Sequence, residues 1–344
     1  KNNDGTIEGI EKLTLVAKNG VDINELYANK LQELTIKGSG NLEIASLTQD
    51  ANKEFNKLED GGINAFESNG FTNFDASAFK GKVTADISKI AKDWVDPNDS
   101  ANFLTTTITG SAQDDVFYAG HDASGKGYTG AFGGRTKIVG GAGNDKLVVV
   151  DGGIVKNDRL ELAEISGIES LEVRNQKGAS QTVDFDAIKD NVLEKVTVRD
   201  EKADAEDSKF IFENVSKEFA DNKKFVIEHS VTKTAAEDKR APELDISLKD
   251  ATGADDKVTV EVVNGKNTQE DFAFKIKANG IENVNIVDSD TENNTVTITK
   301  GAESSLNVSG GKAKQWYDIK GVTSKVVDAS SYAGDLRLQV TADS

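Results

Sequence analysis

The sequence has no cysteine and no methionine among its 344 residues, and its only histidines are His121 and His229. The lack of cysteine excludes disulfide bonds, thiolate metal sites, iron–sulfur clusters and cysteine nucleophiles. Two histidines so far apart in the chain could hold zinc only if carboxylates supplied the other ligands. These absences disfavour most hydrolases, and the lack of readily oxidised side chains favours an extracellular protein.

Proline and long apolar runs are also scarce. Only two prolines occur beside 31 glycines, so the turns must be built from glycine, asparagine and aspartate, which is typical of β architecture. No stretch approaches the length of a membrane-spanning apolar helix, so we expect no membrane insertion. The sequence opens at Lys1 without an initiator methionine or signal-peptide core, as a processed piece or cloned fragment would.

The charge is strongly negative. Lysine and arginine total 41 against 59 aspartates and glutamates, which gives a formal net charge of −18. Such a charge disfavours nucleic acids and anionic bilayers as partners. A cation fits better, and Ca²⁺ is the expected one.

Short apolar-polar-apolar runs are the clearest periodic signal, and they predict strands with one buried face. They occur at residues 13–15, 34–36, 42–44, 196–198, 258–260, 284–286 and 296–298. Helical patterns are a minority, and we expect them to decorate a β core. The candidate short helices are residues 23–31, 49–58, 87–94 and 185–193.

Two short motifs recur along the chain. Gly-Ile-Glu followed by alternating apolar residues occurs at residues 9–15, 167–173 and 280–286, and Asp-Ala-Ser with a following aromatic residue and glycine occurs at 75–83 and 328–336. Irregularly spaced repeats of this kind predict the stacked rungs of a parallel β-solenoid. The glycine would allow a tight corner, the isoleucine would fill the interior, and the aspartate would cap its own turn. The alternative is that Asp75 and Asp328 help to bind Ca²⁺.

The most specific segment is Gly140-Gly141-Ala142-Gly143-Asn144-Asp145-Lys146-Leu147-Val148, which fits the pattern GGxGxDxUx, where U is apolar. Its glycines permit a tight loop with inward-pointing carbonyls, and the aspartate adds a carboxylate. A degenerate copy lies at 109–117, with Asp114 aligned to Asp145, and a looser echo at 252–258 places Asp256 before a strand.

These residues resemble the RTX (hemolysin-type) calcium-binding nonapeptides, whose turns stack into a β-roll with Ca²⁺ between the loops. The resemblance implies that Asp145 and Asp114 are side-chain ligands. It also implies carbonyl ligands from four further residues, Gly141, Gly143, Gly110 and Ala112. The sequence departs from the family pattern because a glycine-rich insertion, residues 125–134, separates the two turns.

The wider context of rungs, Asp-Ala-Ser corner and calcium turns looks like the RTX-type surface-layer (S-layer) proteins of Gram-negative bacteria such as Caulobacter and Campylobacter. That resemblance implies type I secretion, calcium-dependent folding outside the cell, and self-assembly into a two-dimensional lattice on the bacterial surface. In that family an N-terminal region anchors to lipopolysaccharide, and no such region is identified in this sequence.

The expected fold is therefore mostly β, a parallel β-solenoid or RTX-like β-roll with short helical decorations. We expect solenoid rungs with helical insertions over residues 1–108, calcium-binding turns with an inserted loop over 109–153, and a second solenoid segment over 154–344. Residues 200–243 are dense in acids, and they are interpreted as a solvated lobe. Its packing residues would be Phe210, Phe212, Phe219 and Phe225.

An enzyme is not expected. The sequence contains no HExxH, GxSxG or GxxxxGK[ST] motif, and His121 is interpreted as an exposed loop residue. The alternative to a lattice subunit is a secreted RTX adhesin or carbohydrate-binding module. A carbohydrate-active enzyme that uses only carboxylates is less favoured.

Overall fold

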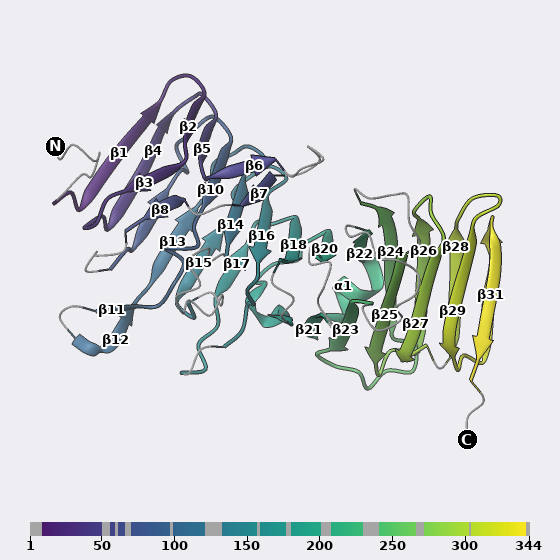
Figure 1. Cartoon of the computed structure of the whole chain (residues 1–344). Coiled ribbons are helices and arrows are strands. Elements are labelled where there is room, and N and C mark those ends of the chain that lie inside the picture. The colour runs from purple at the N-terminus through teal and green to yellow at the C-terminus, as the bar shows by residue number, and fades with distance from the viewer. Residues whose placement is uncertain are drawn as a thin grey trace. The chain divides into compact units, whose positions relative to one another are not determined.

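The computed structural model describes residues 9–49, 56–58, 61–65, 70–96, 99–120, 133–156, 159–176, 180–200, 208–229, 241–265, 272–302 and 304–341. These residues form long parallel sheets whose strands alternate along the chain, which confirms the predicted mostly-β, parallel β-solenoid (Figure 1). The chain divides into two compact units. The first comprises residues 1–171 and 187–193, and the second comprises 172–186 and 194–344.

The first unit contains two parallel sheets joined by corners. In the order of pairing, one sheet consists of β1 (Lys12–Ala17), β4 (Glu33–Gly38), β9 (Asn73–Asp75), β13 (Thr106–Thr109), β15 (Thr136–Val139) and β17 (Glu164–Ser166). The other contains β2 (Val21–Ile23), β5 (Leu42–Ile44), β10 (Val83–Asp86), β14 (Val116–Ala119) and β16 (Lys146–Val150). The chain alternates between these sheets, so each pass adds one rung.

Short two-stranded pairs occupy the connections of the first unit. They are β3 (Glu25–Tyr27) with β8 (Gly62–Asn64), β6 (Leu47–Gln49) with β7 (Asn56–Leu58), and β11 (Trp94–Asp96) with β12 (Asp99–Leu104). The first of these pairs is parallel and the other two are antiparallel. Strand β18 (Ser170–Asn175) carries the chain from the first unit into the second.

The second unit also has two parallel sheets. One contains β20 (Lys195–Asp200), β22 (Lys224–His229), β24 (Lys257–Asn264), β26 (Asn283–Ser289), β28 (Ser305–Gly310) and β30 (Val326–Tyr332). The other consists of β19 (Gln181–Asp184), β21 (Lys209–Val215), β23 (Glu243–Leu248), β25 (Phe272–Asn279), β27 (Asn294–Lys300), β29 (Trp316–Val322) and β31 (Asp335–Val340). All seven predicted apolar-polar-apolar runs lie in strands of the two units, as expected.

The core of each unit is a set of columns in which apolar side chains from successive rungs lie in register. In the first unit one column runs through Leu34, Phe74, Ile108, Ile138 and Ile165. All five side chains are fully buried. Each such burial contributes about 1.5–3 kcal/mol. Because every column position contacts the rung before and the rung after, the sequence needs an apolar residue at the same place in each rung.

Helices are minimal in the described residues. They are the 3-10 turn η1 (Phe185–Ala187) and the α-helix α1 (Lys217–Asn222), whose N-cap Ser216 accepts the N–H of Phe219 at 3.2 Å. The predicted helix at 23–31 is wrong, because its residues include strand β3 and the N–H of Ala28 bonds across rungs to Asn64 O at 3.0 Å.

The other three helix predictions also fail within the described residues. Residues 87–94 form one turn, in which the Ala91 N–H bonds to Ile87 O at 2.8 Å, before strand β11 begins. Residues 185–193 are helical only in η1, and residues 56–58 are strand β7, while 50–55 lie outside the described residues. Some backbone donors of these segments bond to neighbouring rungs instead, as the Ile87 N–H does to Tyr118 O and the Lys189 N–H to Ile165 O, both at 2.8 Å.

The phenylalanines of the expected acidic lobe pack together with Phe185. Ring centroids lie 5.0 Å apart for Phe212 and Phe225, 5.3 Å apart for Phe219 and Phe225, and 5.2 Å apart for Phe185 and Phe219. Phe210 is also buried. Residues 208–229 are regular rungs of the second unit around α1, and the acid-rich segments 201–207 and 230–240 lie outside the described residues.

No helix in the described part of the chain has the length and apolar character needed to cross a membrane.

Candidate metal centre

Three corners stack in the first unit, where the chain passes from one sheet to the other. They are residues 110–115 between β13 and β14, 140–145 between β15 and β16, and 167–169 between β17 and β18. Backbone bonds join them rung to rung: the Gly110 N–H donates to Val139 O at 2.8 Å and the Gly140 N–H to Ser166 O at 2.9 Å. The nonapeptide 140–148 therefore lies between two other corners.

The pairing of β14 with β16 corrects one sequence alignment. Val116 pairs with Lys146, which sets Asp115 opposite Asp145. The alignment of Asp114 with Asp145 is therefore displaced by one residue. Asp114 is exposed and accepts the N–H of Asn144 at 2.9 Å, whereas Asp115 is fully buried.

Each corner places one acidic side chain against the backbone of the preceding rung. The Val83 N–H donates to Asp115 Oδ1 at 2.7 Å, and the Asp115 N–H donates to Asp145 Oδ1 at 2.7 Å. The Asp145 N–H in turn donates to Glu169 Oε2 at 2.6 Å. We call this series, Asp115, Asp145 and Glu169, the carboxylate ladder. Sequence analysis missed Asp115 and Glu169, although an acid immediately before each strand is a signal that could have identified them.

Asp145 is the least satisfied member of the carboxylate ladder. Its side chain is fully buried, and its Oδ2 has no hydrogen-bond partner. Burial above all, together with the charges of Asp115, Glu169 and Asp114, raises the pKa of Asp145 to about 7 against the lowering effect of the Asp115 N–H. Burial also raises the pKa of Asp115. The ladder therefore concentrates negative charge at the buried Asp145, whose pKa is raised by three neighbouring carboxylates.

The glycines of these corners allow the rungs to approach closely. A Cβ on Gly140 would overlap the carbonyl oxygen of Gly167, and one on Gly110 would overlap that of Gly140. Gly141 and Gly143 adopt φ values of +119° and +128°, which other residues rarely adopt. The glycine pattern is thus explained by stacking alone, and it also leaves backbone oxygens near the carboxylates.

The predicted ligands gather at the same stack. Asp145 is central, and Asp114 lies close enough for its charge to raise the pKa of Asp145. The Ala112 carbonyl accepts the Gln113 side-chain amide at 2.9 Å. Within the described ranges, no three acidic or histidine side chains converge closely enough to form a metal-binding group. A cation at this stack would therefore depend on backbone carbonyls as well as carboxylates, which is the ligand chemistry of Ca²⁺.

The corner at 252–257 in the second unit has the same arrangement of a buried aspartate and a glutamate from the next rung, and here a lysine lies beside the aspartate. Asp256 is buried, and its N–H donates to Glu282 Oε2 at 3.0 Å, as the Asp145 N–H does to Glu169. Here the Lys217 ammonium lies 2.5 Å from Asp256 Oδ1. A lysine from α1 thus supplies positive charge to this corner.

The recurring motifs have the structural roles expected of them. Gly9, Gly167 and Gly280 of the three Gly-Ile-Glu copies adopt φ values of +78°, +60° and +72°. In the second and third copies the isoleucine is buried, and the glutamate accepts a corner N–H. Asp75 and Asp328 accept the N–H of the serine two residues on, both at 2.9 Å, so they cap their own turns.

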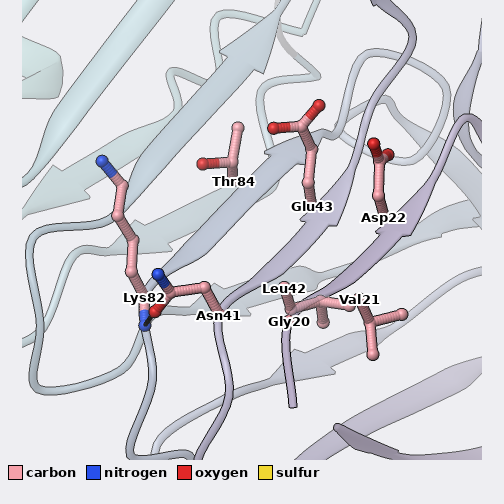
Figure 2. A pocket seen from close by; sticks show the side chains of 8 residues that line it. All are labelled: Gly20, Val21, Asp22, Asn41, Leu42, Glu43, Lys82 and Thr84. Atoms are coloured by element: carbon pink, nitrogen blue, oxygen red, sulfur yellow. Dashed lines mark hydrogen bonds between the residues drawn. The ribbon is translucent and has the colours of Figure 1, made fainter.

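A separate hollow of about 380 Å³ lies on the outer face of β2, β5 and β10. Figure 2 shows Asp22, Glu43 and Thr84 projecting to the same side from these neighbouring strands, with Lys82 and Asn41 at one end. Partial burial and, secondly, the charge of Asp22 raise the pKa of Glu43. This carboxylate pair could bind sugar hydroxyls or exchange a proton, but no aromatic residue is among the eight that line the hollow.

Comparisons with known proteins found no relative of this chain. No protein-family model, curated protein or solved structure matches the chain. The function must therefore be argued from the chain's own residues.

Proposed function

We propose that this chain is a calcium-binding structural subunit of a self-assembling S-layer on a bacterial cell surface. The observation that carries the proposal is the buried Asp145, whose second carboxylate oxygen has no partner among stacked glycine corners. A buried, unpaired carboxylate is costly unless it is protonated or meets a cation. The glycine-rich nonapeptide around it supports Ca²⁺ as that cation.

Calcium fits the oxygen atoms that the corners supply. Asp145 and Asp114 would contribute carboxylates, and the corner residues Gly110, Ala112, Gly141 and Gly143 would contribute carbonyls. Bound Ca²⁺ would neutralise the crowded charges and so couple metal binding to folding. An affinity of roughly 10⁻⁴ to 10⁻³ M, typical of extracellular modules, would leave the sites empty and the fold less stable in a calcium-poor cytosol. Such a chain suits type I secretion followed by folding outside the cell.

An open edge in the second unit supports self-assembly. Strands β30 and β31 are the last in their sheets, and no further strand pairs with them among the described residues. Val326, Leu338 and Val340 on these strands are 57%, 40% and 66% exposed. Unpaired backbone groups beside exposed apolar side chains favour pairing with a further strand. In the proposed lattice, another copy of the chain would supply that strand.

Calcium titration of the full chain tests the proposal. We expect CaCl₂ to raise the melting temperature measured by circular dichroism, and electron microscopy to show ordered sheets at the same calcium concentrations. Asp145→Asn should weaken the calcium response without abolishing the strand signal. A melting temperature unchanged by calcium or EGTA would overturn the calcium role, and dispersed monomers at saturating calcium would overturn the lattice.

A second candidate function rests on the hollow of Figure 2. The adjacent Asp22 and Glu43 favour an adhesin or carbohydrate-binding module that uses this groove. A glycan array probed with the wild type and with Glu43→Gln tests it. Glycan binding that Glu43→Gln removes would support this function, and an array without binding would contradict it.

A further inference from the structure

One rung of the second unit has polar residues at inward positions of both sheets. In one sheet a column runs through Ile227 and Val262 and then reaches Asp288, which is only 2% exposed. In the other sheet Asn294, which is fully buried, pairs with Phe272. Since each column otherwise gains its stability from apolar contacts, these two buried polar side chains need a compensating interaction.

Neutral donors surround Asp288. Its Oδ2 accepts Gln315 Nε2 at 3.0 Å and the Tyr332 hydroxyl at 3.2 Å, and its Oδ1 accepts Asn294 Nδ2 at 3.2 Å and the Asp290 N–H at 3.3 Å. All four donors are neutral, so none of them carries a positive charge to offset that of this buried carboxylate.

Two buried oxygens beside this carboxylate have no partner. The Tyr317 hydroxyl is fully buried and unpaired, and Tyr317 lies opposite Asn294 in the pairing of β27 with β29. Asn294 Oδ1 is also unpaired, although the same amide contacts Asp288 through its nitrogen. Each unsatisfied buried group costs about 1–3 kcal/mol. Two unpaired buried oxygens therefore lie beside the Asp288 carboxylate.

The turn between β26 and β27, together with the strand ends on either side of it, is rich in side chains that carry oxygen. Its sequence, Asp-Ser-Asp-Thr-Glu-Asn-Asn over residues 288–294, carries an oxygen ligand at every second position. The N–H groups of Thr291 and Glu292 donate to Asp290 Oδ1 at 2.6 and 3.1 Å, which curls the loop around that side chain. Gln315 Nε2 also donates to the Glu292 carbonyl and closes the loop from the following rung.

We propose that residues 288–294, closed by the Tyr317 hydroxyl, bind a hard divalent cation within the second unit. Ca²⁺ is the expected ion, because it accepts irregular sets of carboxylate, amide, carbonyl and hydroxyl oxygens, whereas Mg²⁺ demands octahedral geometry and retains its waters. Asp288 and Asp290 would balance the charge of one such ion. An ordered water could satisfy the orphaned oxygens, but it would bring no positive charge to the buried Asp288. This site does not depend on the corners at 110–145.

Terbium luminescence tests the site, because Tb³⁺ binds calcium sites and a nearby tyrosine transfers excitation to it. The calcium-free full chain is titrated with Tb³⁺ while tyrosine is excited. We expect saturable emission that Ca²⁺ displaces, and binding roughly tenfold or more weaker in Asp290→Asn. Asp250→Asn is the matched control, because Asp250 is an exposed aspartate of the same unit that accepts the Thr252 N–H and hydroxyl.

Asp145→Asn separates this site from the one proposed at the corners. Emission that persists in Asp145→Asn and falls in Asp290→Asn supports the site at 288–294. Emission that falls only in Asp145→Asn, or that Asp290→Asn leaves unchanged, overturns it. Loss of calcium-dependent stability in Asp145→Asn would bear only on the corner site, so the two proposals fail separately.

Tyr317→Phe covers the case in which Asp290→Asn does not fold. Removing an unpartnered hydroxyl should not lower the metal-free melting temperature. If the hydroxyl is a ligand, however, Ca²⁺ should raise the melting temperature of Tyr317→Phe less than that of the wild type. An equal rise in both proteins, with no change in Tb³⁺ emission, would exclude Tyr317 as a ligand and overturn the site as proposed.

Discussion

Asp145 has one carboxylate oxygen bonded to the Asp115 N–H and a second oxygen without a partner, although the side chain is fully buried. Without a cation, the folded protein stabilises the protonated form of this side chain more than the unfolded chain does. The two states therefore bind protons differently between the ordinary aspartate pKa and the folded value of about 7.

This difference predicts an unusual pH dependence in EGTA. Because the folded pKa is raised, the stabilisation is fully present below about pH 4 and is lost as pH rises through about 7. Asp145→Asn should reduce that loss. At pH 7.5 its free energy of unfolding should exceed that of the wild type by about 1–3 kcal/mol, so it should unfold at a higher urea concentration. Urea titrations across this pH range check it. Parallel pH profiles in the two proteins would show that Asp145 does not titrate as described.

Lys217 gives a second prediction for a single residue. Its ammonium lies 2.5 Å from the buried Asp256 Oδ1, so Lys217→Met leaves that carboxylate without its cation. We expect a lower melting temperature at neutral pH, measured by circular dichroism. Lys217→Arg should recover most of the wild-type behaviour, and Lys249→Met is a control that removes a comparable ion pair, to the more exposed Asp186. Equal losses in both methionine variants would contradict a special role for the Asp256 corner.

Among the elements, the strands and the Gly-Ile-Glu corners were predictable because their signals are local. An apolar-polar alternation and a glycine before a glutamate can be identified without knowing what they contact. The short helices were not, since whether residues 23–31 form helix or strand depends on Asn64, which pairs with them from a distant part of the chain. The α-helix α1 was missed, although Ser216 before Lys-Glu-Phe is an N-cap signal.

The candidate site was predictable only in part for the same reason. The nonapeptide pattern identified Asp145, but the register that brings Asp115 opposite it is a property of two paired strands. A one-residue change in that register exchanges the exposed Asp114 for the buried Asp115. The pair Asp288 and Asn294 was missed because inward polar residues can be recognised only after the columns are known.

The close stacking of corners predicts that Gly140 cannot be replaced. A Cβ at this position would meet the Gly167 carbonyl oxygen and, at 2.6 Å, Asp145 Oδ2, and the backbone cannot move without separating two rungs. We expect Gly140→Ala to destabilise the protein by about 1–3 kcal/mol or more, as overpacking does. Gly20, at the corner between β1 and β2, has open space around it, so Gly20→Ala is the matched control. Similar urea midpoints for both variants would mean that the corners are less tightly stacked than described.

At the scale of the whole molecule, the proposed lattice would have to form despite a net charge of −18 on each copy. Like-charged copies repel one another at low ionic strength, and divalent cations reduce that repulsion in addition to any folding effect. In this proposal the apolar edge of β30 and β31 would supply the attraction, because its exposed side chains would be buried by a further rung. Assembly and calcium binding are therefore expected to respond to different substitutions.

A charge placed on this edge should prevent assembly without unfolding the chain. Val326 and Val340 are 57% and 66% exposed, so the double substitution Val326→Lys and Val340→Lys costs little in the monomer but places two ammonium groups where a neighbouring strand would pair. We expect at least about tenfold weaker association, equivalent to about 1.4 kcal/mol, by sedimentation velocity in CaCl₂.

Leu160→Lys controls for lysine at another exposed apolar position, since Leu160 is 79% exposed and lies outside every strand. Because lysine also lowers the negative charge, it reduces repulsion between copies, so weaker association can arise only from the lost edge contact. Undiminished assembly of the double variant would place the interface elsewhere on the molecule.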